Sequence, residues 1–383
     1  MASKKRQCLL ADLCSRDDHR KPEHSKMNTS IDPQVARIRA SLLAWYDAHR
    51  RDLPWRAKSG VRADPYAVWL SEIMLQQTTV ATVGPYFGNF KAQWPTVGAM
   101  AAGSLDEILV AWQGLGYYAR ARNLYKCAGV VVSEHGGVFP ETEDELRKLP
   151  GIGSYTAAAI ASIAFDQPCV PVDGNIERVT ARLYDIDIPL PKGKKDIYAA
   201  AQSFISKDRP GDFAQAMMDL GSGVCAPRSP KCEICPLNAD CQAYKTGNPA
   251  RLPVKAPKKI RPERCCVVFW LENADGDVLM QKRPETGLLG GMTGFVSTSW
   301  REGAWPEPTE IETASPLSIE WAEIPGEAVH VFTHFRLTMR VLKGKAQKGA
   351  NVDGFWVAPT VFAEHALPTV MKKVIKLVGE NPS

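Results

Sequence analysis

The chain has 383 residues, of which 45% are hydrophobic and 23% are charged, a globular composition with enough length for two domains. Six of its ten cysteines form no regular framework, and the sequence shows no secretory h-region and no apolar run of transmembrane length. We therefore expect a soluble protein of a reducing compartment with no membrane partner. The formal charge of +5 is unevenly distributed: residues 1–264 carry 36 basic and 28 acidic residues, and residues 265–383 carry 11 basic and 14 acidic residues. The first part is therefore the better surface for an anionic polymer such as DNA. An ordinary solvated surface fits the same charges.

Residues 1–30 are polar with mixed charges, a composition typical of a disordered tail. Beyond them, apolar residues recur at helical spacing, first over 34–49 and then over 66–76. Since no β-alternation of comparable length interrupts this pattern, residues 31–250 are predicted to form a mainly α domain. Further helices are expected over 105–112, 119–134, 142–148, 155–165, 175–184, 196–205 and 212–221.

Four cysteines lie close together near the end of this helical part, in the pattern C-x6-C-x2-C-x5-C over residues 225–241. Thiolates this close can converge on one metal centre, which favours an iron–sulfur cluster, with a zinc site and a disulfide network as the alternatives. Structural zinc sites usually pair two short knuckles, whereas here one C-x2-C has unequal arms. The spacing resembles the [4Fe–4S] loop of the endonuclease III family of DNA repair glycosylases. The candidate ligands are Cys225, Cys232, Cys235 and Cys241.

A change of composition and period marks a second domain. Residues 251–264 hold six basic residues, one acid and three prolines, as in an extended linker. Beyond them a period of two predicts a β-hairpin around the turn at 273–276 and a strand over 331–341. With a final helix over 368–378, residues 265–383 are predicted to form a small α+β domain.

The segment LPGIGSYTA, which begins at residue 149, has the form of a turn between two helices. Gly151 and Gly153 allow a tight hairpin whose N–H groups point outward at the start of the second helix, where an anion can bind. Such a hairpin would grip a DNA phosphate without reading bases. On its own, an ordinary helix connection fits equally well.

Long motifs occur at WLSEIMLQQT from residue 69, GLGYYARARNL from residue 114, LPGIGSYTA and VDGN. Together with the cysteine loop they resemble the MutY family of adenine DNA glycosylases, in the helix-hairpin-helix or endonuclease III superfamily. The resemblance implies a monofunctional enzyme of base-excision repair that hydrolyses the N-glycosidic bond of adenine paired with 8-oxoguanine or guanine in double-stranded DNA. It also implies a mainly α helix-hairpin-helix domain with a [4Fe–4S] cluster, followed by an α+β Nudix-like domain that reads the oxidised base.

The resemblance assigns the chemistry to Glu72 of WLSE and Asp173 of VDGN. A protonated Glu72 would donate to N7 of adenine as the glycosidic bond breaks, and an ionised Asp173 would stabilise the oxocarbenium-like sugar or capture it transiently. Apolar neighbours such as Trp69 would keep Glu72 protonated, and a helix N-terminus would keep Asp173 ionised. Without the resemblance, Glu72 fits an exposed helix carboxylate and Asp173 a helix N-cap. Tyr155 and Asn175 are implied to support the two carboxyl groups.

Tyr155 also bears on the type of reaction. In lyase members of the superfamily a lysine after the hairpin attacks the sugar as a Schiff-base nucleophile, whereas this chain has Ser154, Tyr155 and Thr156 there. We therefore expect little or no strand cleavage. A bifunctional enzyme of the endonuclease III type and a non-catalytic lesion-binding protein are the alternatives.

Other residues are implied to contact DNA. Adenine must leave the base stack to reach a catalytic pocket, so the protein needs residues that enter the duplex. The resemblance assigns this role to Gln77 and Tyr117, with core packing as the alternative for Tyr117. The adenine pocket is implied to include Arg51, Leu53, Trp55 and Arg56, and phosphate contacts are implied for Arg228 and Lys231.

The second domain departs from the nucleotide pyrophosphohydrolases that it resembles. Their G-x5-E and R-E-x-x-E-E carboxylates bind magnesium, yet the residues after Gly291 read MTGFVSTSWREGAWPEP, so no such hydrolase activity is expected. The segment FTHF matches a family F-S-H segment that contacts 8-oxoguanine, with Thr333 in place of serine and His334 after it.

We expect a monomer located in the bacterial cytoplasm, or in the nucleus of a eukaryote.

Overall fold

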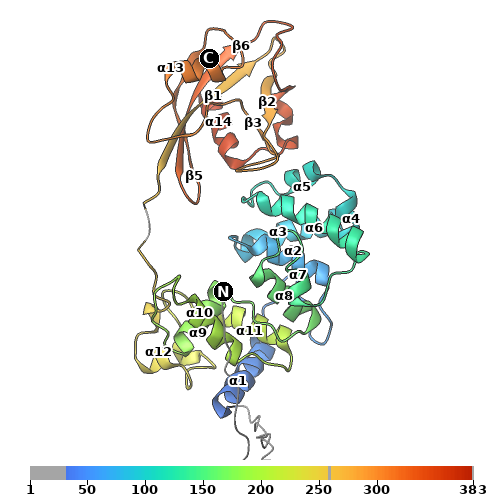
Figure 1. Cartoon of the computed structure of the whole chain (residues 1–383), viewed down its shortest axis with the longest axis vertical. Helices are drawn as coiled ribbons and strands as arrows, with labels where there is room; N and C mark the ends of the chain where they lie inside the picture. Colours follow the sequence, from blue (N-terminus) through green and yellow to red (C-terminus); the bar gives the residue numbers. More distant parts are fainter. Residues whose placement is uncertain (1–31, 258–259, 382–383) are drawn as a thin grey trace, which may run out of the picture.

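The computed structural model of the protein describes residues 32–257 and 260–381, and the tail predicted over residues 1–30 lies outside this part. Figure 1 shows a helical unit, coloured blue to yellow, and a second unit built on a sheet, coloured orange to red. Within the described ranges, no helix combines the length and the apolar character needed to cross a membrane.

The first part of the chain is helical, as predicted, and side-chain caps begin several of its helices. Asp64 accepts a hydrogen bond from the backbone of Tyr66, and Ser104 forms a capping box with Glu107. The elements are α1 (Pro33–His49), α2 (Pro65–Leu75), α3 (Val80–Gln93), α4 (Val97–Ala102), α5 (Leu105–Ala111), α6 (Ala119–His135), α7 (Glu143–Leu146), α8 (Ser154–Phe165), α9 (Gly174–Leu183), α10 (Lys194–Ser203), α11 (Pro210–Gly223), η1 (Cys232–Ile234), α12 (Gln242–Lys245) and η2 (Pro249–Arg251).

Helices α3 and α4 are not predicted from the sequence. Helix α3 contains Pro85 between Gly84 and Gly88, which weakens its helical pattern, and α4 has only six residues. Thr79 and Thr96 cap the two helices through hydrogen bonds from the backbone three residues on. Both pack on elements that carry long motifs, α3 on α2 and α4 on α6.

The helical part has two hydrophobic cores. One surrounds α2, α6 and α8 and includes Trp69 and Trp112, whereas the other joins α1, α9 and α11 and includes Phe213. Helix α8 contacts α2, and α11 contacts both α8 and α9. The two cores therefore meet where these four helices come together, and this meeting place brings Glu72 on α2 and Asp173 before α9 into one region.

The second part is an α+β unit, as predicted. In its sheet the order is β3-β2-β1-β6-β5, with β4 on β1 and β7 on β2; β1 is parallel to β6 and the other pairs are antiparallel. Helix α14 packs on β5 and β6. The elements are β1 (Glu263–Glu272), β2 (Val278–Lys282), β3 (Thr293–Gly294), β4 (Arg301–Glu302), α13 (Pro308–Ala314), β5 (Ala322–Val331), β6 (Arg336–Lys345), β7 (Phe355–Val357), η3 (Pro359–Glu364) and α14 (Thr369–Glu380).

One predicted strand is wrong at its start. The range 331–341 is not a single strand, because β5 ends at Val331 and β6 begins at Arg336. The N–H of Phe332 donates to the carbonyl of Phe335 across 2.8 Å and closes a turn. The FTHF segment therefore forms the tip of the β5–β6 hairpin. Strand β1 begins at Glu263, inside the range predicted as a linker.

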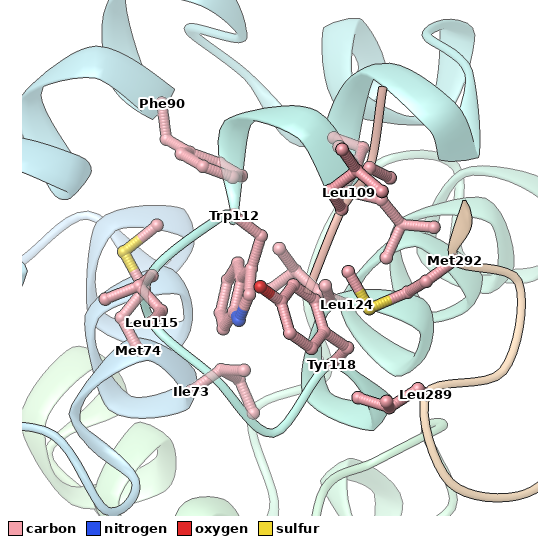
Figure 2. Packing of buried hydrophobic residues seen from close by; sticks show 14 of the residues in the cluster. Ile73, Met74, Phe90, Leu109, Trp112, Leu115, Tyr118, Leu124, Leu289 and Met292 are labelled. Carbon is pink, nitrogen blue, oxygen red and sulfur yellow. The ribbon is translucent and has the colours of Figure 1, made fainter. Parts of the chain in front are cut away.

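The two parts of the chain share an apolar cluster. Leu289 and Met292, in the loop between β2 and β3, belong to the same buried cluster as Leu109 of α5 (Figure 2). Beside this cluster, Nη1 of Arg122 on α6 donates to the carbonyl of Gly290 across 2.6 Å. The second unit is thus packed against α5 and α6, next to the GLGYYARARNL motif.

Candidate active site

Glu72 lies near the end of α2 and is only 6% exposed, so it is not the exposed helix carboxylate that its position alone suggested. Burial disfavours the charged form and raises the pKa of Glu72 to about 7. A hydrogen bond from Tyr155 and the charge of Arg56 oppose this rise, whereas the nearby Asp173 adds to it. A carboxyl group with this pKa holds a proton in a substantial fraction of molecules at neutral pH.

Tyr155 is the second residue of α8, immediately after the glycine hairpin. Its hydroxyl donates a hydrogen bond of 2.7 Å to Oε2 of Glu72. Burial raises the pKa of Tyr155 well above its ordinary value, so the phenol stays protonated and remains a donor. The hairpin therefore delivers a neutral hydrogen-bond donor to the carboxyl group on α2.

Asp173 is the N-cap of α9. Its Oδ1 accepts hydrogen bonds from the N–H groups of Asn175 (2.9 Å) and Ile176 (2.7 Å), and its Oδ2 accepts one from Nδ2 of Asn175 (2.7 Å). Burial raises the pKa of Asp173, and these hydrogen bonds act in the opposite direction because they favour the carboxylate. The cap and a role in chemistry are compatible, since both oxygens are held in a fixed place by donors.

A pocket opens against Glu72. Its wall includes Arg51, Leu53, Trp55 and Arg56, the four residues that the resemblance implies for the adenine pocket. Apolar surface, guanidinium groups and one protonatable carboxyl group suit a flat base with polar edges. The structure thus brings this segment, which precedes α2 in the chain, together with the proposed acid.

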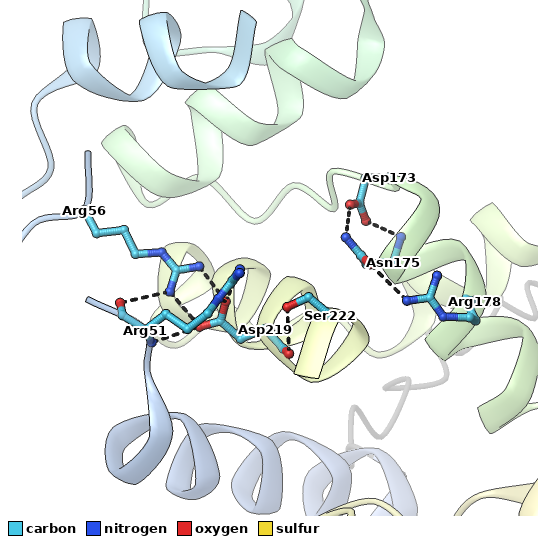
Figure 3. A network of polar contacts seen from close by, with 7 residues as sticks. All are labelled: Arg51, Arg56, Asp173, Asn175, Arg178, Asp219 and Ser222. Carbon is cyan, nitrogen blue, oxygen red and sulfur yellow. Dashed lines mark hydrogen bonds and ion pairs between the residues drawn. The ribbon is translucent and has the colours of Figure 1, made fainter. Parts of the chain in front are cut away.

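Asp219 on α11 is a residue of the site that no sequence motif indicates. It is 3% exposed, and its carboxylate accepts hydrogen bonds from Nη1 (2.6 Å) and Nη2 (2.8 Å) of Arg56 and forms an ion pair with Arg51 (Figure 3). The available signal was an aspartate in the mostly apolar run AQAMMDLG. Its partners could not be identified, because they come from a distant segment of the chain.

Asn175 connects the N-cap of α9 to the cysteine loop. Its Oδ1 accepts a hydrogen bond of 2.9 Å from Nη2 of Arg178 (Figure 3). Nε of Arg178 in turn donates to the carbonyl of Cys225 across 2.8 Å. The chain of contacts from Asp173 through Asn175 and Arg178 therefore ends at the first predicted metal ligand.

The four cysteines predicted as metal ligands line one small cavity, together with Arg182, whose Nη1 lies 3.2 Å from Sγ of Cys225. None of the cysteines in the described ranges is paired in a disulfide, so the disulfide network is not supported. Within the same ranges, no three His, Cys, Asp or Glu side chains stand close enough together to hold a single metal ion.

The residues implied to contact phosphate differ in their backbone conformation and in their exposure. Gly151 has φ of +75°, and a Cβ there would lie 2.5 Å from Cβ of Asn123, so this position requires glycine. Gly153 is the N-cap of α8 and has an ordinary φ of −87°, so it is not needed for an unusual backbone conformation. Its lack of a side chain leaves the N-terminus of α8 open to a ligand. Arg228 and Lys231 are exposed on the cysteine loop, as a phosphate contact requires.

Gln77 and Tyr117 both adopt left-handed backbone conformations, with φ of +60° and +49°. Gln77 is exposed and Tyr117 is 48% exposed, so core packing does not explain Tyr117. Both line a cavity of about 510 Å³ between the two domains, to which Thr333 and His334 also contribute. The hydroxyl groups of Tyr117 and Thr333 are hydrogen-bonded at 2.7 Å, a contact that the sequence does not predict.

Two family models match the chain: residues 70–207 match the HhH-GPD superfamily of base excision DNA repair proteins, and residues 267–377 match the NUDIX domain. The solved structure of a thermostable thymine-DNA glycosylase is 30% identical, with a TM-score of 0.50, and covers 56% of this chain and 97% of that one. The fold and the buried carboxyl pair thus define a helix-hairpin-helix protein of base-excision repair with a C-terminal NUDIX domain.

Curated relatives narrow the class to one activity. The adenine DNA glycosylase of Homo sapiens is 34% identical over 433 aligned positions, which cover 95% of this chain and 79% of the human protein. That of Arabidopsis thaliana is 37% identical, covering 79% of this chain and 56% of the plant protein. The chain belongs to the adenine DNA glycosylase family, whose members act in base-excision repair, and it is an enzyme of that type and not a non-catalytic lesion binder.

Proposed function

We propose that the chain excises adenine paired with 8-oxoguanine or guanine, and that it does so without cutting the DNA strand. One observation carries this proposal: the residues implied to enter the duplex and those implied to read the oxidised base line the same cavity between the domains. Gln77 and Tyr117 come from the catalytic domain, and Thr333 and His334 come from the hairpin tip of the second domain. A base opposite the adenine would meet both sets at once.

The proposed chemistry uses the two buried carboxyl groups in different protonation states. Because Tyr155 already donates to Oε2 of Glu72, Oε1 is the oxygen that would carry the proton delivered to N7 of adenine. Asp173, fixed by three hydrogen bonds, would face the positive charge that develops on the sugar as the glycosidic bond breaks. Its negative charge stabilises that transition state, and water completes the hydrolysis.

Strand cleavage would need an amine that attacks the sugar, and the position after the hairpin holds Tyr155 instead. The protonated phenol of Tyr155 is occupied with Glu72 and is a poor nucleophile. The bifunctional alternative therefore lacks its nucleophile at this position.

The cysteine loop fits a [4Fe–4S] cluster held by the four cysteines that share one cavity. A four-iron cluster is larger than one ion, so its four sulfur ligands lie farther from one another than the ligands of a zinc site, where each zinc–sulfur bond is roughly 2.3 Å long. The guanidinium of Arg182 beside Cys225 suits ligands that are thiolates. When bound, such a cluster would cross-link the loop. Iron and sulfide analysis of the purified protein should give about four of each per chain; a zinc-loaded, iron-free and active protein would contradict the cluster.

A single-turnover assay tests the proposed function. Labelled duplexes carry adenine opposite 8-oxoguanine, guanine or thymine, and products are resolved with and without alkali. We expect cleavage at adenine only after alkali, with excision fastest opposite 8-oxoguanine. Equal rates opposite 8-oxoguanine and thymine would refute lesion reading, and cleavage without alkali would refute the monofunctional reaction.

A further inference from the structure

Arg120 of α6 is a buried arginine that connects two separate segments of the catalytic domain. Its Nη1 donates to the carbonyls of Ile73 (2.8 Å) and Met74 (2.9 Å), at the end of α2. Its Nη2 donates to the carbonyls of Leu115 (2.9 Å) and Gly116 (3.2 Å). One guanidinium thus binds backbone groups of two segments that both reach the cavity between the domains, one through Gln77 and the other through Gly116 and Tyr117.

The two segments that Arg120 joins are the ones that present Gln77 and Tyr117. The carbonyl of Met74 precedes Gln77 by three residues, and the carbonyl of Gly116 belongs to the residue directly before Tyr117. Both Gln77 and Tyr117 have positive φ, which a residue with a side chain seldom adopts unless its surroundings hold it there. The hydrogen bonds of Arg120 restrain the backbone in both of these segments.

The electrostatic setting of Arg120 is unusual for a structural arginine. It is 8% exposed, and within the described residues no carboxylate forms an ion pair with it. Its charge is met instead by backbone carbonyls, including those at the negative end of α2, and by the rings of Trp112 and Tyr117 at 5.2 Å and 5.6 Å. A buried cation without an acid is costly, so its directional contacts indicate a purpose beyond packing.

We infer that Arg120 is a positioning residue that fixes Gln77 and Tyr117 in one common geometry, so that the two enter DNA as a single unit during recognition of the mispair. This inference rests on the proposed function, which assigns both residues to the opening of the duplex. Arginine is needed because its planar fork binds several carbonyls in fixed directions, whereas a lysine carries the charge on one mobile point. The ring of Tyr117 contacts the guanidinium, and its hydroxyl reaches Thr333, so the geometry set by Arg120 extends to the second domain.

The test measures base unstacking separately from chemistry. In a Glu72→Gln background, 2-aminopurine is placed next to the mispair, and the rise in its fluorescence is recorded at saturating protein. We expect Arg120→Lys to lose most of this rise, as Gln77→Ala and Tyr117→Ala do. In the chain with Glu72 intact, Arg120→Lys should slow single-turnover excision by about tenfold to a hundredfold, the scale of a misplacement near 1 Å in an assembled site.

Two further variants complete the experiment. Arg39→Lys is the matched control, because Nε of Arg39 donates to the carbonyl of Phe204 in the other core, and it should keep the full rise. Thr78→Val removes one weaker acceptor of Arg120, at 3.3 Å, and should give an intermediate rise in a fully folded protein. If Arg120→Lys does not fold, the fluorescence rise with Thr78→Val decides whether the contacts of Arg120 position Gln77 and Tyr117.

The outcomes separate this inference from the proposed function. A full rise in folded Arg120→Lys, or in Thr78→Val, with loss in Gln77→Ala and Tyr117→Ala would overturn the positioning role alone. A full rise in both alanine variants would refute their assigned part in opening the duplex. In that case a loss in Arg120→Lys would also overturn the inference, since its effect could not pass through these two residues.

Discussion

The hydroxyl of Tyr155 donates a 2.7 Å hydrogen bond to Oε2 of Glu72, which joins the residue behind the glycine hairpin to the buried carboxyl group on α2. The hairpin that would grip the DNA backbone and the acid that would protonate the base are therefore one hydrogen bond apart. This bond favours the charged form of Glu72, and burial favours the neutral form and prevails, with a resulting pKa of about 7.

The dependence of excision on pH should report this balance. The proposed mechanism uses Glu72 in its protonated form, so the single-turnover rate should fall as the pH rises through about 7. Tyr155→Phe removes an interaction that lowers the pKa of Glu72, and the alkaline limb should therefore move to higher pH. Tyr125→Phe, which removes a tyrosine hydrogen bond to the carbonyl of Gly103, is the control and should leave the limb in place. An unmoved limb in Tyr155→Phe would show that another group titrates.

Replacement of either carboxylate should remove chemistry and spare binding. We expect Glu72→Gln to lower the single-turnover rate by about 10²–10⁴-fold, the usual contribution of a positioned acid. Asp173→Asn should lower it by about 10²–10³-fold, the usual loss when one group that stabilises transition-state charge is removed. Asparagine caps helices as well as aspartate does, so Asp173→Asn should retain the fold and duplex affinity. Asp32→Asn at the N-cap of α1 is the matched change and should be silent. Rates near that of the parent protein in either carboxyl variant would contradict the assignment.

Asp219→Asn should change both stability and the pH profile. The side chains of Asp219 and Arg56 are 2% and 6% exposed, and an unpaired buried charge lowers the free energy of unfolding by about 3–5 kcal/mol. The charge of Arg56, no longer balanced, should also lower the pKa of Glu72 and move the alkaline limb of excision to lower pH. Urea unfolding measures the change in stability, and the single-turnover rate measured as a function of pH shows the shift of the alkaline limb.

The control for this prediction lies on the same helix. Asp212 pairs with Arg209, but their side chains are 32% and 39% exposed, so Asp212→Asn should cost no more than about 1 kcal/mol and leave the pH profile unchanged. Equal effects of the two substitutions would argue against a special role of the buried pair.

The two hairpin glycines should respond differently to alanine. Gly151→Ala forces a left-handed conformation that costs about 1–2 kcal/mol and adds the collision with Asn123. At Gly153 the φ is ordinary and no atom outside the adjoining residues lies within 4 Å of a new Cβ, so Gly153→Ala should cost less than about 1 kcal/mol. Urea midpoints of the two variants check the order, and a reversed order would contradict the geometry.

Much of the site can be predicted from sequence where the chemistry lies within a short motif. Glu72 and Asp173 stand in contiguous segments, and the helices around them follow apolar periodicity. Asp219 and Arg120 could not be found this way, because their partners come from distant segments and only folding reveals that a charge is buried. The tip of the β5–β6 hairpin was missed for a related reason: Thr333 continues the alternation of β6, and only the Phe332–Phe335 hydrogen bond ends it.

The apolar cluster shared by the two domains determines how the chain can be divided. Leu289 and Met292 bury part of their surface against α5 and α6. A fragment that stopped in the linker would leave the face around Leu109 bare, and the complementary fragment would carry an exposed apolar loop. Each half made alone should therefore be prone to self-association, so the protein should be expressed with both halves on one chain.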